Sequence, residues 1–403
     1  MSSRSTRSPR TRSPRARLLV GLLAFALVAA ACGTGELPQN TLSGLEGPEA
    51  RNVDRLWDLV LPIAAVIFVL VQGLVIFVVV KFRARSDDDQ PVQVHGNAKA
   101  EIGWTIVPAL ILAVVGVFTV VTVFDINERA EGAEVLQVKV IGHQWWWEYD
   151  YPEEGIVTAN ELVIPAGRQV QLELSSADVI HNFWPPKLAG KVYAIPGRIN
   201  YMKVQADRPG DYSGQCAEYC GLSHANMRLR VIALSAEDFD QWVEDQQDDA
   251  PAPPTTTTTT TAPTTSTSEA GDDAGTSGSS SASGTSAGTS LATDEEETPP
   301  GEDPELDRAI GAELFISKGC SGCHAVAGLE GANGRIGPNL THLYSRSRFA
   351  GAVFELNDRN LRRWLRDPPA MKPMNPDNGQ GMPNLGLSED EITQLIAYLE
   401  TLK

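Results

Sequence analysis

Cysteine is scarce in this sequence. The 403 residues contain five cysteines: Cys32, Cys216, Cys220, Cys320 and Cys323. A small secreted domain that relies on disulfides uses many more cysteines in a short chain, so that class is excluded. Each of the five lies inside a short, recognisable motif, and each therefore raises the question of what chemistry it serves.

Basic residues are also few. The chain has 33 Lys and Arg against 51 Asp and Glu, a net charge of −18. Because binding to nucleic acid requires a basic surface, we expect no nucleic-acid partner. Residues 251–304 hold nine acidic residues and no Lys or Arg, and Leu291 is the only large apolar side chain between Val243 and Leu306. Such a segment cannot offset its ordering entropy by burial, so residues 246–304 are predicted to be a disordered Thr/Ser/Pro-rich acidic linker.

Charge is absent from two long apolar runs, 59–80 and 102–124, of 22 and 23 residues. Each exceeds the roughly 20 residues that a helix needs to cross a bilayer. We therefore predict a transmembrane hairpin over residues 56–128. Basic residues directly follow the first run, which places the connecting loop in the cytoplasm and everything after the second run outside: Lys81, Arg83 and Arg85.

The N-terminus has the features of a signal peptide, residues 1–31. Six arginines precede residue 18, and an apolar stretch then leads to "AAAC". A cysteine directly after small residues is typical of lipoprotein processing, so Cys32 is a candidate for lipidation. The alternative is ordinary signal cleavage with Cys32 as a bystander. Residues 32–55 would be an extracytoplasmic segment in either case.

Two further domains are expected outside the membrane. Residues 130–245 contain alternating and β-branched stretches such as "ELVIPAGRQVQLELSS", which predict an all-β domain. Residues 305–403 return to helical periodicity and end in "SEDEITQLIAYLETL", a helix with a Ser cap.

The motif "CSGCH", Cys320 to His324, is the covalent attachment site of c-type haem. Cys320 and Cys323 would bond the haem edge and His324 would bind the iron. A redox dithiol or half of a zinc site is the alternative, but no second CxxC is present. The sixth iron ligand in such domains is often Met. The spacing favours Met382, with Met374 next and Met371 third.

The stretch "GQCAEYCGLSHANMRLR" brings soft ligands together: Cys216, Cys220, His224 and Met227. Thiolate, imidazole and thioether ligands select copper. A mononuclear blue-copper site needs only one cysteine, so the second thiolate is expected to bridge to a second metal. A further histidine is required, and "SADVIHNFWPP" supplies His181.

These motifs resemble subunit II of cytochrome c oxidase, the family that carries the dinuclear copper centre CuA. The resemblance includes "HGNAKAEIGWTIVPALIL", "GHQWWWEYDY", "DVIHNFWPPKLAG" and "IPGRIN", and it covers residues 50–235. The C-terminal part resembles oxidases whose subunit II carries its own class I cytochrome c. The resemblance implies a multidomain chain: a two-helix transmembrane hairpin, an all-β cupredoxin-like domain, the linker, and an all-α cytochrome c domain.

The resemblance also implies roles for single residues. Cys216 and Cys220 would bridge two coppers, His181 and His224 would each bind one, and Met227 would bind one by its thioether. Glu218 would give its backbone carbonyl to copper and its carboxylate to a magnesium ion at the subunit interface. Trp145 matches the position where electrons enter, and Glu101 the mouth of a proton channel. Tyr193 departs from the family, which usually has an acid there, and this puts docking of an external cytochrome in doubt.

The function implied is electron transfer from the attached haem through CuA to a catalytic haem-copper subunit that reduces O2 to water and pumps protons. The implied partners are subunit I, subunit III and other oxidase subunits, with a cytochrome c or a quinol–cytochrome c reductase complex as donor. The implied location is the plasma (inner) membrane of a bacterium. Two alternatives stay open, namely the electron-input subunit of a nitric oxide reductase and a membrane-held copper chaperone.

Several residues also have simpler interpretations. Trp146 and Trp147 would serve as core or membrane-interface residues, and Glu101 as an ordinary interfacial charge. His342 is predicted to be a packing or surface residue and His95 a loop residue.

Overall fold

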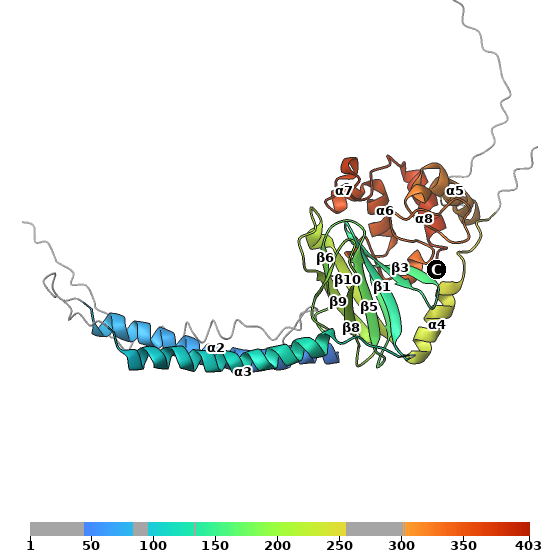
Figure 1. The fold of residues 1–403 in the computed structure, drawn as a ribbon. Coiled ribbons are helices and arrows are strands. Elements are labelled where there is room, and N and C mark those ends of the chain that lie inside the picture. Colours follow the sequence, from blue (N-terminus) through green and yellow to red (C-terminus); the bar gives the residue numbers. More distant parts are fainter. Residues whose placement is uncertain (1–43, 84–95, 133, 255–300, 302) are drawn as a thin grey trace, which may run out of the picture.

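The computed structural model describes residues 44–83, 96–132, 134–254, 301 and 303–403. Figure 1 shows a long helical hairpin, a β domain and a helical C-terminal domain. The predicted signal peptide, Cys32, His95 and most of the predicted linker lie outside the described residues. The predicted architecture of hairpin, β domain and helical domain is confirmed.

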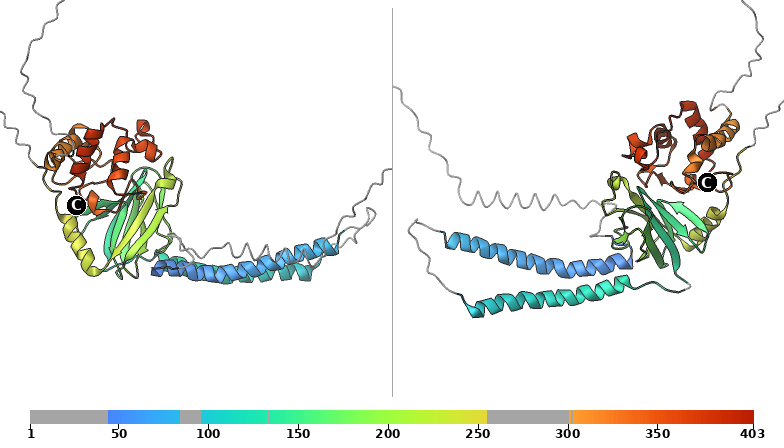
Figure 2. Two further views of the ribbon diagram at one scale, coloured as in Figure 1. Left: turned by 180° about the vertical axis from the view of Figure 1, so that it is seen from behind. Right: turned by 45° about the horizontal axis from the view of Figure 1, so that its top comes forward.

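The hairpin consists of α2 (Pro48–Lys81) and α3 (Ala98–Asn127), which lie side by side (Figures 1 and 2). Among the described residues these two helices are long and apolar enough to cross a membrane. Both helices extend beyond the predicted apolar runs. The N-terminal end of α2 and the C-terminal end of α3 lie against the β domain. There Asn52 donates to the Asp125 carboxylate at 2.7 Å, and Lys203 lies 3.5 Å from the Glu49 carboxylate.

The β domain is a sandwich of two five-stranded sheets, with strand orders β3-β2-β1-β5-β8 and β4-β10-β9-β6-β7. The inward residues of each strand fill the core between the sheets, as the burial of Leu229, Val231 and Ala233 along β10 illustrates. The helix α4 (Ala236–Gln247) follows the last strand of the sandwich. Ser235 is its N-cap residue, and the Ser235 side chain accepts from Asp238 N. The strands are β1 (Leu136–His143), β2 (Trp146–Tyr151), β3 (Ile156–Ala159), β4 (Glu161–Pro165), β5 (Val170–Ser176), β6 (His181–Trp184), β7 (Val192–Ala194), β8 (Asn200–Val204), β9 (Gly210–Cys216) and β10 (Arg228–Leu234).

The C-terminal domain is built on the packing of α5 (Pro304–Ser317) against α8 (Glu389–Leu399), with α6 (Asp358–Arg366) and the short α7 (Pro368–Met371) beside them. Gly311 allows the close approach of α5 and α8, because a Cβ there would overlap the backbone of Gln394. Ser388 and Glu391 form a capping box at the start of α8. A two-stranded ribbon, β11 (Arg348–Phe349) and β12 (Phe354–Glu355), precedes α6.

The C-terminal domain packs on the end of the sandwich that lies away from the membrane hairpin (Figures 1 and 2). The backbone N–H of Arg228 donates to Gly351 O at 2.9 Å, and that of Ala250 to Ala327 O at 3.1 Å. His342 fills part of this junction, with one ring nitrogen 2.7 Å from Lys403 O and the other 3.0 Å from Asp248 O. The two domains therefore share a defined interface.

Candidate metal centre and haem cavity

Two strand ends and the loop that follows β9 bring the predicted copper ligands together at the interface end of the sandwich. His181 begins β6, Cys216 ends β9, and β6 pairs with β9 in antiparallel register. The ligand atoms of His181, Cys216 and Cys220 all lie within 4.8 Å of one another. The two sulfurs are 3.8 Å apart, and Nδ1 of His181 is 4.0 Å from Cys216 Sγ.

The loop from β9 to β10 supplies the remaining donors of the cluster. Nδ1 of His224 lies 3.6 Å from Cys220 Sγ, and the Met227 thioether sulfur lies 3.8 Å from the same sulfur. The backbone carbonyl of Glu218 lies 3.2 Å from Cys216 Sγ. All six predicted ligand residues thus lie in one cluster, in which His181, Cys216, Cys220 and Met227 are buried and Glu218 and His224 are half-buried. Two thiols, two imidazoles, a thioether and a carbonyl are a donor set that fits two soft metal ions sharing the thiolates.

Cys216 is poised to lose its proton. The hydrogen bond from Cys220 lowers the pKa of Cys216 to about 4, and the hydrogen bond from His181 acts in the same direction. The same contact with Cys216, together with burial, raises the pKa of Cys220. Thiolates are the form in which cysteine binds metal, so Cys216 is the thiol that is prepared for metal ligation.

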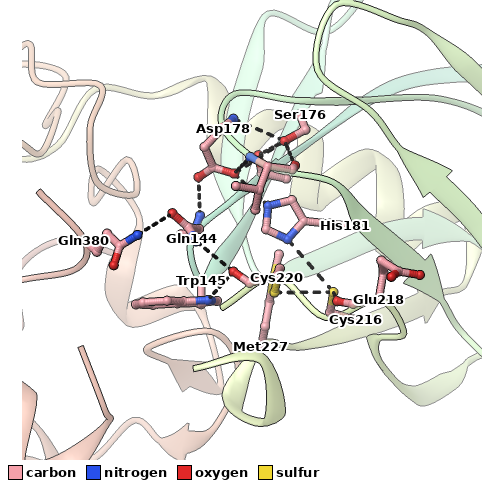
Figure 3. Close-up of polar contacts among 12 residues, drawn as sticks. Gln144, Trp145, Ser176, Asp178, His181, Cys216, Glu218, Cys220, Met227 and Gln380 are labelled. Carbon is pink, nitrogen blue, oxygen red and sulfur yellow. Dashed lines mark hydrogen bonds and ion pairs between the residues drawn. The ribbon is translucent and has the colours of Figure 1, made fainter. Parts of the chain in front are cut away.

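Asp178 orients the first histidine of the cluster, as Figure 3 shows. Its carboxylate lies 2.8 Å from Nε2 of His181, which leaves Nδ1 facing the cysteines. Burial raises the pKa of Asp178, but the hydrogen bonds from His181 and the Val179 N–H outweigh burial and hold it below the ordinary value. A carboxylate behind a ligating histidine fixes the ring and its tautomer. The sequence analysis did not identify Asp178, although it stands three residues before His181 in "SADVIH".

The indole of Trp145 donates a hydrogen bond to the backbone of a predicted copper ligand, Cys220. Its Nε1 donates to Cys220 O at 3.1 Å, and the side-chain amide of Gln144 donates to the same oxygen at 2.7 Å (Figure 3). Trp145 is 2% exposed. The two tryptophans that follow Trp145 in the sequence have other surroundings. Trp147 packs edge-on against Phe183 in the core, and Trp146 stacks on His143 with ring centroids 4.1 Å apart. Both are therefore packing residues of the sandwich.

A cavity of about 560 Å³ lies inside the C-terminal domain and reaches the β domain. Cys320, Cys323 and His324 line it, as the haem-attachment motif predicts. Nδ1 of His324 lies 2.8 Å from Pro338 O, so Nε2 faces away from that carbonyl and is free to bind a metal. Burial lowers the pKa of His324 and keeps the ring neutral. Gly337 is required here, because a Cβ would lie 2.5 Å from the His324 ring.

Two methionines line this cavity, and Met371 does not. Met382 packs with the C-terminal core, and its sulfur accepts from the Trp364 indole N–H at 3.2 Å. Met374 packs against the core of the β domain instead. Met382 is therefore held by the domain that carries His324, which agrees with the preference for it from spacing.

Buried cations also face the cavity. Lys372 is 3% exposed, and its ammonium donates to Trp145 O at 2.7 Å and Ala350 O at 2.9 Å. Burial lowers its pKa to about 7. Arg346 is also buried, its pKa is lowered to about 10, and its Nε has no partner among the described residues. Two buried cations and an orphaned donor fit a group that carries carboxylates, as haem does.

Glu101 lies apart from both sites, whereas Tyr193 lies at the edge of the copper cluster. Glu101 is exposed in the first turn of α3 and accepts from Asn97 N at 3.1 Å. Tyr193 lies beside Glu218, and this contact raises the pKa of Tyr193. Gln144, Lys372 and Glu161 were not among the predicted site residues, and each has a partner in the other domain. The Gln380 amide donates to Gln144 Oε1 at 3.2 Å, the Lys372 ammonium donates to Trp145 O, and the Glu161 carboxylate accepts from the backbone N–H of Ser347.

Three sequence-family descriptions match this chain. They are "Cytochrome C oxidase subunit II, transmembrane domain" over residues 40–121, "Cytochrome C oxidase subunit II, periplasmic domain" over residues 154–234, and "Cytochrome c" over residues 309–403. Together they span the hairpin, most of the sandwich and the C-terminal domain.

Individual relatives match over most of their length. Cytochrome c oxidase subunit 2 of Alkalihalophilus pseudofirmus is 32% identical, over 92% of this chain and 93% of that protein. Cytochrome c oxidase subunit 2 of Bacillus subtilis is 30% identical, over 96% and 98%. A crystal structure of the periplasmic domain of subunit II of cytochrome oxidase of Bradyrhizobium japonicum is 31% identical, covers 30% of this chain and 97% of that one, and has a TM-score of 0.29.

Proposed function

The chain belongs to the cytochrome c oxidase subunit II family, and from that premise we propose that it conducts electrons from its own covalently attached haem, through a dinuclear CuA centre, to a catalytic haem-copper subunit. Its family and its cytochrome c domain make it an electron-transfer subunit of an oxidoreductase complex. The oxidase domain implies copper and the cytochrome c domain implies haem. The dinuclear form of the copper and the covalent form of the haem are proposals.

The observation that carries the proposal is the clustering of six donor residues, four of them buried. In the proposed centre Cys216 and Cys220 would hold two coppers by their thiolates, and His181 and His224 would each bind one by Nδ1. Met227 and the Glu218 carbonyl complete the set. Bound copper would supply a one-electron redox centre. Burial of both sulfurs keeps water from the thiolates and their immediate surroundings.

In the proposed haem site Cys320 and Cys323 would attach the haem covalently, and His324 and Met382 would bind its iron. The Pro338 carbonyl fixes the His324 ring, and Trp364 fixes the Met382 sulfur. Bound haem would supply a second one-electron centre. Trp145 lines this cavity and also donates to Cys220 O, so a single side chain connects the two sites. We assign it as the residue through which electrons pass.

The membrane placement follows the same proposal. The chain is a membrane protein whose β domain is of the periplasmic type. We propose that both soluble domains lie outside a bacterial plasma membrane and that Lys81 and Arg83 face the cytoplasm. Glu101, at the cytoplasmic start of α3, would then serve at the mouth of a proton channel. Magnesium at the Glu218 carboxylate stays a prediction.

The test is to purify the intact complex through a tag on this chain and to follow O2 and NO consumption with a reduced donor. We expect O2 uptake, and two coppers and one c-type haem in this chain. Cys220→Ala should lose copper, whereas Tyr219→Phe, a change at a 77% exposed residue of the same loop, should not. NO uptake without O2 uptake would indicate a nitric oxide reductase. Neither activity, with one copper or none bound, would indicate a copper chaperone.

A further inference from the structure

A buried carboxylate of the β domain has its hydrogen-bond partners in the C-terminal domain. Glu161, the first residue of β4, is 7% exposed. Its carboxylate accepts from the backbone N–H of Ser347 at 3.1 Å, from the Ser347 hydroxyl and from the backbone N–H of Arg348 at 3.0 Å. Hydrogen bonds to an ionised acceptor are among the stronger ones in proteins. Glu161 therefore anchors the segment of residues 347–352, which we name the docking loop.

The far end of the docking loop approaches the copper ligands closely. Gly351 O accepts from the backbone N–H of Arg228, which directly follows Met227. A Cβ on Gly351 would lie 2.6 Å from Lys372 Nζ of its own domain, and 2.7 Å from Trp145 O and 3.0 Å from Asn226 O of the β domain. Only glycine lets the two backbones come this near.

The backbone of the docking loop is strained in the same place. Ala350, Gly351 and Ala352 all have positive φ, at 54°, 78° and 56°. Alanine rarely adopts this conformation, and such strain persists where the surroundings determine it. The surroundings here include hydrogen bonds across the interface, from Arg228 N to Gly351 O and from Glu161 to the start of the loop. The loop is therefore shaped to fit the β domain.

We propose that the docking loop and Glu161 fix the C-terminal domain in one position on the β domain, and that Glu161 and Gly351 are positioning residues for electron transfer from the haem of the C-terminal domain, through Trp145, to the copper site. This inference rests on the proposed function and adds to it how donor and acceptor are held. The transfer moves one electron and makes or breaks no bond. Since the docked domain helps to bury Trp145, an external donor delivers its electron to the C-terminal domain, not to the copper site.

The test uses the full chain in its purified complex and two pairs of variants. Glu161→Ala removes the anchor, and Glu237→Ala removes an exposed carboxylate of α4 as its control. Gly351→Ala places a methyl group against the β domain. Gly386→Ala is its control, because Gly386 also has positive φ, 65°, but faces open space.

The first readout is amide hydrogen exchange of residues 226–231 and 345–352. Leaving the donors of Glu161 unpaired should accelerate exchange in both segments about 10- to 100-fold. Gly351→Ala should likewise accelerate exchange in both segments. Exchange within α8 should be unchanged, which shows that the domain itself is folded. Equal exchange in Glu161→Ala and Glu237→Ala would overturn the proposal.

The second readout is the rate of haem-to-copper electron transfer against solvent viscosity. Wild type should show no dependence, because its domains are already docked, and Glu161→Ala should become slower as viscosity rises. A viscosity-independent rate in Glu161→Ala, equal to wild type, would also overturn the proposal. If wild type transfers no electron while Glu161→Ala still exchanges faster, the proposed function fails and the docking stands.

Discussion

Replacing Asp178 by asparagine tests how the predicted copper ligand His181 is held. The Asp178 carboxylate accepts from the backbone N–H of Val179 at 2.6 Å and of Gln144 at 2.5 Å, besides its 2.8 Å contact with His181. Asparagine has nearly the same shape but no charge, and one of its two polar atoms is a donor. The imidazole of His181 therefore loses its ionised partner, and the backbone N–H of either Val179 or Gln144 loses its acceptor.

The size of the effect follows from the role of such carboxylates. Partners that orient a ligating histidine typically change metal affinity 10- to 100-fold, which corresponds to about 1.4–2.7 kcal/mol. We expect Asp178→Asn to weaken copper binding by about this factor while five of the six ligand residues keep their surroundings. Copper affinity is measured by competition with a chelator of known strength on the full chain.

Asp150→Asn is the matched control. Asp150 belongs to the same domain and pairs with Lys139 at 3.0 Å on the surface, away from the cluster. Equal copper affinities in the two variants would refute the reasoning. A second result would also contradict the prediction. It is a fall in the melting temperature of the copper-free protein that occurs only in Asp178→Asn and accounts for the whole loss of copper affinity, because the role of Asp178 would then be purely structural.

Three further predictions concern the C-terminal domain. Met382→Leu should lower the haem reduction potential measured by redox titration, and Met374→Leu should not, because a thioether ligand raises the potential; the reverse result would exchange the two assignments. Gly337→Ala should destabilise the domain by about 1–3 kcal/mol in thermal unfolding, because its Cβ would lie 2.5 Å from the ring of the predicted haem ligand; an unchanged melting temperature would contradict this. The hydrogen bond from Lys318 lowers the pKa of Glu391 below its ordinary 4.5, so the stability that Glu391 contributes is complete above pH 4.5 and is lost as pH falls through the lowered value. Melting curves should show wild type above Glu391→Gln at pH 7 and the difference shrinking in acid, and a difference that grows in acid would be inconsistent with this sign.

Sites built from short stretches of chain could be predicted from the sequence. Cys220 and Met227 lie seven residues apart in a single loop, and their sulfurs lie 3.8 Å apart. Cys320, Cys323 and His324 likewise lie within five residues. His181 is distant in sequence, and only its resemblance to a known family placed it; the pairing of β6 with β9 is what carries it to Cys216.

Contacts across the domain interface could not be predicted. Nothing local to Glu161 or Lys372 distinguishes them from surface charges, and both are buried because one domain packs on the other. The positive φ of Ala350 is equally invisible in "RFAGAV", since alanine gives no signal for it. The role of Asp178 was within reach, because a carboxylate three residues before a ligand histidine is a reasonable partner to seek.

The most direct test of the account is to reduce the C-terminal haem with a light pulse in the purified complex and to follow haem and copper absorbance together. We expect haem oxidation and copper reduction to share one first-order rate that does not change with protein concentration, because donor and acceptor lie in one docked chain. A rate that rises in proportion to concentration, or haem oxidation without copper reduction, would contradict it.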